Sequence, residues 1–268
     1  MQRLGIIDCF WVITNFTGKT LAIAELEARK LHHDFTELIT RAVQPALWLL
    51  IFGEVLASVR AIPTGNLPYV DFMAPGILAQ SVLFIAIFYG IAIIWERDLG
   101  IVHKFLSTPT PRSALVLGKA LSAGERGLVQ AAIVYALALG LGVQLSWNMF
   151  SLLLVVVVIV LGSALFSTFS LIIACLVKTR ERFMGIGQVL TMPLFFASNA
   201  IYPISIMPNW LQVISQVNPL TYETDALRAL MLTNGPTVYG VLFDLLFLVA
   251  ATTANVAIAT KLYSRVVI

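Results

Sequence analysis

An uninterrupted run of apolar residues constrains this chain more than any other feature. The twenty residues from Gly76 to Trp95 contain no charged side chain, and the run ends at Glu96-Arg97-Asp98. At the α-helical rise, such a run matches the thickness of a bilayer's hydrocarbon core, roughly 30 Å. Hydrophobic residues make up 59% of the chain and charged residues only 12%, about half of the roughly 25% usual in a soluble domain. The chain is therefore predicted to be a membrane protein.

Six apolar stretches are long enough to be interpreted as transmembrane helices. Near the N-terminus, Asp8 interrupts a separate apolar stretch and no small-residue cleavage site follows it, so no signal peptide is expected and the spans direct insertion. The fourth stretch is longer than a perpendicular helix needs, and we expect it to tilt, or to bend near Gly162-Ser163. The six ranges are 42–59, 72–95, 127–145, 149–177, 183–204 and 237–260.

Lysine and arginine predict the orientation of these spans. An even number of spans places both termini on one side, and all of the 17 Lys and Arg residues except Arg60 and Arg228 fall on that side. The positive-inside rule then places both termini in the cytoplasm and the protein in the plasma (inner) membrane. Residues 1–268 are expected to form one transmembrane domain. Its parts are a cytoplasmic N-terminal region (1–41), a six-span bundle (42–260) and a cytoplasmic tail (261–268).

Residues 21–38 are too charged to cross a membrane, yet their apolar residues recur at intervals of three and four. Charged residues occupy much of the remaining circumference. This pattern is typical of an amphipathic helix that lies on the cytoplasmic interface and leads into the first span. A helix packed on a soluble partner is the alternative. The apolar face includes Leu21, Leu31, Phe35 and Leu38.

The longest cytoplasmic connection after the N-terminal region covers residues 96–112. It contains a short apolar stripe with charges around it, and Pro109 and Pro111 end any helix there. Such a helix has no core of its own to cover, so we expect its apolar face to dock into another polypeptide. A loop that lies against the lipid headgroups is the alternative. The candidate residues are Glu96, Arg97, Leu99, Gly100, Val102, Phe105 and Leu106.

The outer segment 205–236 contains two apolar helices that are too short to cross the membrane. Asn218-Pro219 is typical of an N-cap followed by proline at the first helical position, and Asn234-Gly235-Pro236 ends the second helix. We expect this pair to dip into the outer leaflet, where protein or water must satisfy any non-helical backbone. The candidate residues are Asn218, Pro219, Tyr222, Asp225 and Arg228.

Two acidic residues, Glu54 and Asp244, fall inside predicted spans. A charge inside a bilayer is costly and often functional, which suggests a proton or cation relay. The alternative is a polar group bonded to a neighbouring helix or close enough to the interface to stay hydrated. Two isolated acids without a partnered histidine or lysine make a poor relay, which favours this alternative.

The chain shows no catalytic, metal or nucleotide motif. Gly18-Lys19-Thr20 resembles the end of a phosphate-binding loop, but Ile13 stands where that loop needs glycine. His32 and His33, beside Asp34, point in different directions on a helix, and no third metal ligand is in view. We therefore expect no enzyme activity, no metal and no cofactor bound by this chain.

Several short motifs point to one family. They are residues 72–77 (FMAPGI), 96–100 (ERDLG), 106–112 (LSTPTPR), 117–119 (LGK), 218–222 (NPLTY) and 225–228 (DALR). With six spans, they resemble the membrane-spanning permease subunit of a type-2 ABC exporter, the group that includes drug-resistance, lipo-oligosaccharide and polysaccharide export systems. The resemblance covers nearly the whole chain.

The resemblance implies roles for three segments. Residues 96–112 would be a coupling helix seated in a groove of a separate ATPase subunit, residues 21–38 the interfacial connecting helix, and residues 205–236 a re-entrant helix pair. It also implies two ATPases that bind ATP-Mg, a second permease copy or paralogue, surrounding lipids and no nucleic acid. The fold class expected is thus an all-α membrane protein with six transmembrane helices, the interfacial helix and the re-entrant pair.

The cargo is expected to be an amphiphilic drug, a lipid-linked molecule or a glycan. Aromatic residues in the spans either line its path or pack the helices and face lipid; they include Trp48, Phe84, Phe88, Tyr89, Phe195 and Phe196. Two other functions are weighed against export driven by ATP. One is an ion-coupled secondary transporter that uses Asp244 and Glu54, although no convincing inverted repeat is present. The other is a membrane-embedded lipid enzyme, for which no catalytic cluster is found.

Overall fold

The computed structural model describes residues 16–27, 29, 40, 43–59, 62–65, 67–107, 110–177 and 179–263. In these residues the chain is helical, and the only sheet-like pairing is an isolated bridge between Leu145 and Leu232. The expectation of an all-α protein is confirmed for this part of the chain.

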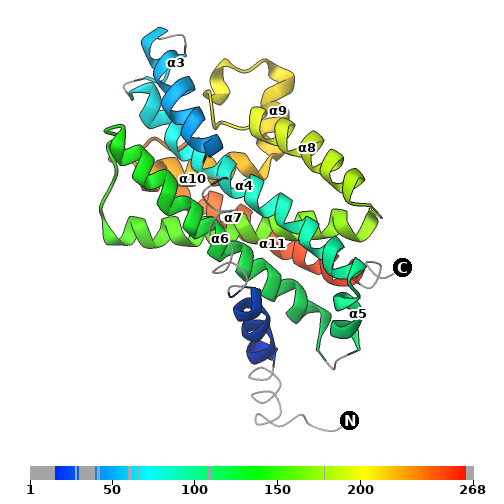
Figure 1. The fold of residues 1–268 in the computed structure, drawn as a ribbon. Helices are drawn as coiled ribbons and strands as arrows, with labels where there is room; N and C mark the ends of the chain where they lie inside the picture. The colour runs from blue at the N-terminus through cyan, green and yellow to red at the C-terminus, as the bar shows by residue number, and fades with distance from the viewer. Residues whose placement is uncertain are drawn as a thin grey trace.

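The elements follow one another in a simple order (Figure 1). A helix at residues 16–27 comes first, and a helical stretch, Val43–Val59, comes next. That stretch contains η1 (Trp48–Gly53) and α3 (Glu54–Val59). The elements that follow it are α4 (Tyr69–Asp98), α5 (Ile101–Leu106), α6 (Arg112–Gly140), α7 (Met149–Leu176), α8 (Arg180–Phe196), η2 (Ile204–Ile206), α9 (Asn209–Val217), α10 (Pro219–Met231) and α11 (Val241–Leu262).

Helix α4 forms the centre of the bundle. It packs against α6, α7, α8 and α10, and 78% of its most apolar window is buried inside the protein. Helix α11 is also strongly apolar, yet only 11% of its most apolar stretch is buried. Because unpartnered apolar surface is unfavourable in water, the exposed face of α11 is suited to lipid.

Three described helices, α4, α7 and α11, are long and apolar enough to cross a membrane. The other predicted spans also fall on helices, but these are shorter or carry charges. Helix α8 has 17 residues and ends at Phe196, not at residue 204 as predicted, three residues after Pro193. Helix α6 begins at Arg112, well before the predicted span at 127. Of the charged residues in this added part, Lys119 and Arg126 are buried, whereas Arg112 and Glu125 are exposed. The number six remains a prediction.

Helix α7 runs without a break from Met149 to Leu176, so the helix is continuous through the site of the expected bend. At Gly162 the side chain of Glu223 from α10 lies against the backbone: a Cβ added there would come within 2.7 Å of Glu223 Oε2. The glycine therefore serves close packing between α7 and α10.

The predicted helix pair after α8 is present as α9 and α10. Asn218 caps α10, since its side-chain oxygen accepts a hydrogen bond from the Leu220 N–H at 3.0 Å, and Pro219 takes the first helical position. The predicted cap is thus confirmed. Helix α10 packs against α4, α7 and α11 and is largely buried, whereas α9 exposes most of its apolar residues.

Candidate functional site

Two regions of the bundle stand out. One is the end where α4 gives way to α5, here called the α5 end; the other is a cavity between helices that is partly open, with Gln44, Met184 and Gln188 of its lining exposed. In Figure 1 the helix at residues 16–27, α5 and the last turns of α11 lie toward the α5 end, and α3 and α9 lie toward the other.

A buried ion-pair network joins three elements at the α5 end. Lys119 Nζ of α6 lies 2.7 Å from Glu96 Oε2 of α4 and 3.3 Å from Glu27 Oε1 of the helix at 16–27. The Tyr89 hydroxyl donates to Glu27 Oε2 at 2.7 Å. All four side chains are buried. Because the charges are desolvated, removal of one partner is costly, and the three elements are held together as a unit.

Neighbouring side chains stabilise the protonated form of Lys119. Burial by itself lowers the pKa of this ammonium group, but Tyr89, Glu96 and Glu27 outweigh that effect and raise the pKa above its usual value. Lys119 is therefore protonated throughout the physiological pH range. The Arg126 guanidinium adds a second cation to the cluster, 4.6 Å from the centre of the Tyr89 ring.

A second, more exposed set of contacts ties α4 to α8. Asp98 at the end of α4 pairs with Arg180 of α8 at 2.9 Å and with Arg97 at 3.1 Å. The Arg180 guanidinium also stacks over the Trp95 ring at 3.8 Å. Arg97 Nη1 donates to the carbonyl of Val177 at 3.4 Å. The last turn of α4 is thus connected to α6, to α8 and to the helix at 16–27.

Helix α5 follows directly from this last turn. Gly100, with a φ of 73°, supplies the left-handed conformation that redirects the chain. Val102 is fully buried and packs in a cluster with Ile23 and Leu115, whereas Leu99 is 67% exposed. The expected apolar stripe is therefore divided: Val102 covers the protein's own core, contrary to the expectation that this helix has none. The side chains of Phe105 and Leu106 lie outside the described residues.

The helix at 16–27 also differs in detail from the expected amphipathic face. Ile23 and Ala24 are buried, but Leu21 is 61% exposed. Glu27, expected among the residues of the polar face, is instead buried in the ion-pair network, because Lys119 and Tyr89 provide partners for its carboxylate. The other predicted members of the face, Leu31, Phe35 and Leu38, lie outside the described residues.

The motif residues of α10 hold neighbouring loops in place. Asp225 accepts hydrogen bonds from the Val238 N–H at 2.8 Å and the Tyr239 N–H at 3.0 Å, which fixes the approach to α11. Arg228 is buried and donates to the carbonyls of Asn199 at 2.7 Å and Phe72 at 3.3 Å. These bonds join α10 to the first turn of α4 and to the segment that follows α8.

Tyr222 packs beside these groups, with its ring stacked on Phe247 of α11 at 3.9 Å between ring centres. It fastens α10 to α11 by aromatic contact.

The two acids of the predicted relay are not brought together. Asp244 is fully buried in the first turn of α11, whereas Glu54 is exposed on α3. Helix α3 packs on η1 and α4, and α11 packs on α6, α7 and α10. A different acid, Glu223, is fully buried next to α7, and neither of its carboxylate oxygens has a hydrogen-bond partner among the described residues.

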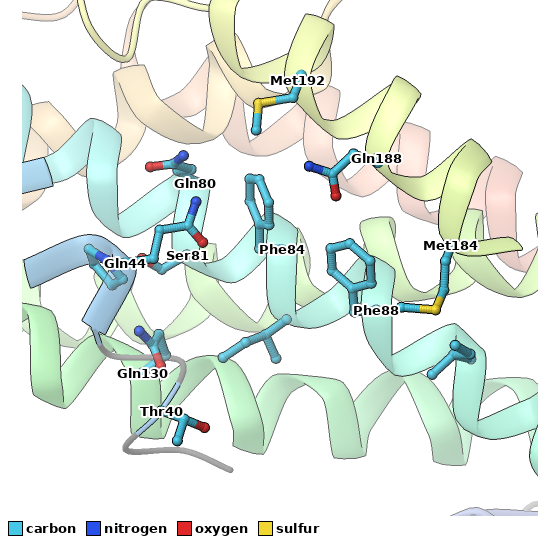
Figure 2. Close-up of a pocket in the computed structure, with 13 residues that line it drawn as sticks. Thr40, Gln44, Gln80, Ser81, Phe84, Phe88, Gln130, Met184, Gln188 and Met192 are labelled. Carbon is cyan, nitrogen blue, oxygen red and sulfur yellow. The ribbon is translucent and has the colours of Figure 1, made fainter. Parts of the chain in front are cut away.

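The cavity lies between α4, α6, α8 and the start of the helical stretch at 43, and has a volume of about 520 Å³. This size is typical of sites for drug-sized molecules. Figure 2 shows amides gathered near one end, with Phe84 and Phe88 of α4 facing α8. The lining residues are Thr40, Gln44, Pro45, Gln80, Ser81, Phe84, Ile85, Phe88, Ile91, Gln130, Met184, Gln188 and Met192.

Sequence reasoning included Phe84 and Phe88 among many aromatics but missed Gln80, Gln130 and the pairing of Lys119. Single glutamines inside an otherwise apolar run were the available signal for the cavity. Lys119 was counted only for its side of the membrane, although it stands between Gly118 and Ala120 in an apolar context.

Residues 19–232 match the ABC-2 type transporter family, and the chain therefore belongs to this family. The ycf38 transport permease of Cyanophora paradoxa is 30% identical over 202 residues, 72% of this chain and 67% of the relative. The daunorubicin resistance ABC transporter permease protein DrrB1 of Streptomyces coeruleorubidus is 25% identical over 199 residues (74% and 70%). The inner membrane transport permease YadH of Escherichia coli (strain K12) is 25% identical over 218 residues (78% and 82%).

Membership confirms the resemblance inferred from the motifs and defines the chain as the membrane component of an ABC transporter. Permeases of this family work with a separate ATPase subunit. Among the described residues, no group of three or more histidine, cysteine or acidic residues could hold a metal ion.

Proposed function

We propose that this chain is the permease subunit of an ATP-driven exporter in the plasma (inner) membrane. Two permease chains, identical or paralogous, would form the translocation path, and two separate ATPase subunits would bind ATP-Mg. Family membership supports the transport role, and the α5 end is the observation that supports coupling to the ATPase. There the exposed Leu99 directly precedes the short helix α5, and the end of α4 before it is connected to three other elements.

The proposed mechanism is a transfer of motion through α4. Closure of the ATPase dimer would displace α5, and the ion pairs of Glu96 and Asp98 would carry that displacement to α6, α8 and the helix at 16–27. The bundle would then shift between inward-open and outward-open states with different affinities for cargo. ATP provides the free energy for this shift.

The interfacial and re-entrant roles complete the proposal. The exposed Leu21 is suited to the lipid boundary, and the exposed apolar residues of α9, such as Trp210 and Val213, are suited to the outer leaflet or to a second permease chain. Both termini would be cytoplasmic. The ion-coupled alternative has less support, because Glu54 is exposed on an element that does not pack against the helix of Asp244.

The proposal is tested by mild-detergent purification of the chain from its host. We expect an ATP-binding protein to co-purify in stoichiometric amounts and to be lost when Leu99→Asp or Phe105→Asp places a charge on the docking surface. Both variants should insert and fold normally, with transport lost. The control is Gln144→Asp, an exposed change in the connection between α6 and α7, away from the α5 end.

Retention of the ATPase and of transport in both α5 variants, at normal expression, would contradict the coupling role. Transport that continues without ATP but follows an ion gradient would favour the secondary-transporter alternative.

A further inference from the structure

Two buried acids meet where α10 joins α11, at the end of α11 that lies away from the α5 end. Asp225 of α10 and Asp244 in the first turn of α11 are both fully buried. The Asp244 carboxyl group lies close enough to that of Asp225 for a hydrogen bond. The partner on a neighbouring helix that was expected for Asp244 is therefore another acid.

The surrounding contacts hold the two acids in this position. Oδ2 of Asp225 accepts hydrogen bonds from the Thr237 hydroxyl at 2.9 Å and from the N–H groups of Val238 and Tyr239 at 2.8 and 3.0 Å. These bonds bind Asp225 to the connection from which α11 begins. The aromatic contact between α10 and α11 joins the same two helices one turn away.

The remaining oxygens of the acid pair lack a donor. Oδ1 of Asp225 and both carboxylate oxygens of Asp244 are buried without a hydrogen-bond partner among the described residues. Ionised carboxylates only accept hydrogen bonds, so two of them side by side cannot bond to each other. One proton on Asp244 changes this, because its O–H group can then donate to Oδ1 of Asp225. A proton needs no cavity, so the buried position of these atoms does not prevent its binding.

The charges around the pair also favour a proton. Arg228, three residues after Asp225 on α10, is buried and is the cation that interacts with Asp225. It balances one carboxylate, and a second ionised carboxylate buried beside the first would be strongly unfavourable. The N-terminal end of α11 favours negative charge, but neither oxygen of Asp244 accepts a hydrogen bond from its N–H groups.

The other titratable groups near Asp244 do not supply a second positive charge. Helix α11 packs against α6, α7 and α10. The cations of α6 lie in its first half, toward the α5 end, and α7 has only Cys175, which packs with Val102 at that end. The groups that remain are neutral or negative: Tyr135 of α6, Tyr222 and Glu223 of α10, and Tyr239 of the connection.

We infer that Asp225 and Asp244 form a binding site for one proton, which the Asp244 carboxyl group donates to Oδ1 of Asp225 and which thereby joins α10 to α11. The proton exchanges with solution through the connection between these helices, since Thr237 and Val238 are exposed. The inference goes beyond the proposed function and depends neither on the ATPase nor on the cargo. It gives the predicted re-entrant helix a contact with the last span that is lost when solution removes the proton.

Infrared spectroscopy detects such a proton directly. A protonated carboxyl group absorbs at a higher frequency than the amide groups, and an ionised carboxylate absorbs at a lower one. The full-length permease in lipid nanodiscs is prepared with ordinary aspartate and with aspartate that carries a heavy carbon isotope in its side-chain carboxyl group. The difference between the two spectra cancels the lipid and distinguishes aspartate from Glu223.

We expect a protonated aspartate band in this difference spectrum at neutral pH. Its absence from the unaltered protein would overturn the inference, whether or not any variant folds. Asp244→Asn keeps a donor for Oδ1 of Asp225 and should remove the band. The matched control, Asp71→Asn, changes another buried aspartate, which accepts from the Gln144 N–H at 3.3 Å, and should leave the Asp244 band in place. An unchanged band in Asp244→Asn would contradict the assigned position of the proton.

The same proton predicts how stability depends on pH. The native state would hold one proton more than the unfolded state, in which aspartate is ionised at neutral pH, so stability falls as pH rises. Relative to Asp244→Asn, the thermal midpoint of the unaltered protein should fall by up to about 3 °C per pH unit between about pH 6 and about pH 9. A difference that stays constant over this range would overturn the inference.

A metal cation is the other ligand that two carboxylates accept. If a cation occupied the pair, the aspartate band would be absent at neutral pH, and the thermal midpoint would rise with calcium chloride and fall with a chelator. That result would overturn the shared proton. Both measurements use the permease alone, so their failure would leave co-purification of the ATPase, and with it the proposed coupling, intact.

Discussion

At the scale of single residues, Lys119 carries the largest expected effect. It pairs with two buried carboxylates, Glu27 and Glu96, so Lys119→Met leaves both without this cation. We expect the free energy of unfolding to fall by about 3–5 kcal/mol, measured as a lower thermal midpoint of the purified protein. The matched control is Arg29→Met, which breaks the exposed pair with Glu25 and should cost less than about 1 kcal/mol.

The charges of Lys119, Glu27 and Glu96 also allow a rescue experiment and predict how the stability depends on pH. Adding Glu27→Gln and Glu96→Gln to Lys119→Met should restore much of the lost stability, and failure to do so would show that charge is not the cause. Because the folded pKa of Lys119 is raised above its ordinary 10.5, its contribution is present below that value and lost only as pH rises through the folded pKa. Stability should therefore show no Lys119-dependent change from about pH 6 to about pH 9.

These residue-level contacts mark where sequence reasoning fails. Glu27 and Lys119 are 92 residues apart in the chain. Glu27 was wrongly placed on the polar face of an amphipathic helix, and Lys119 was used only to assign its side of the membrane. Their pairing depends on how three helices meet, which no local pattern encodes. The cap at Asn218, in contrast, was predicted correctly because all of its atoms come from a few adjacent residues.

At the scale of elements, the approach of α4 to the segment after α8 is set by one glycine. A Cβ added at Gly76 would overlap the Ala200 carbonyl oxygen and come within 2.6 Å of Ala200 Cα. Neither backbone can yield as a flexible side chain would, so Gly76→Ala should destabilise the protein by about 1–3 kcal/mol in thermal unfolding.

The control for this change is another helical glycine. Gly185→Ala lies in α8 with no atom within 4 Å of the added carbon, and should be neutral or stabilise by up to about 1 kcal/mol. Similar thermal midpoints for the two variants would show that the close approach at Gly76 is unimportant.

Hydropathy located the helices well, but it set the start of α6 and the end of α8 wrongly, because charges buried against protein and a turn after Pro193 leave no hydropathy signal of their own.

At the scale of the whole molecule, the number and direction of the spans can be tested by the accessibility of introduced cysteines. In a Cys9→Ser, Cys175→Ala background, single cysteines replace exposed residues in four successive connections: Ser107, Gln144, Thr179 and Val238. With six spans and cytoplasmic termini, a membrane-impermeant maleimide should label Gln144→Cys and Val238→Cys in intact cells. Ser107→Cys and Thr179→Cys should react only after permeabilisation, because the positive charges lie on their side.

The alternation in this pattern decides between two architectures. If only α4, α7 and α11 crossed the membrane, Ser107→Cys and Gln144→Cys would lie on one side and Thr179→Cys and Val238→Cys on the other. Helix α6 and helix α8 would then lie within protein or along the interface. Alternating accessibility requires that both cross, with the buried charges of α6 gathered at the α5 end, where the ion-pair network keeps them out of lipid. Identical labelling of Ser107→Cys and Gln144→Cys would therefore overturn the six-span topology and, with it, the inward position of the coupling helix.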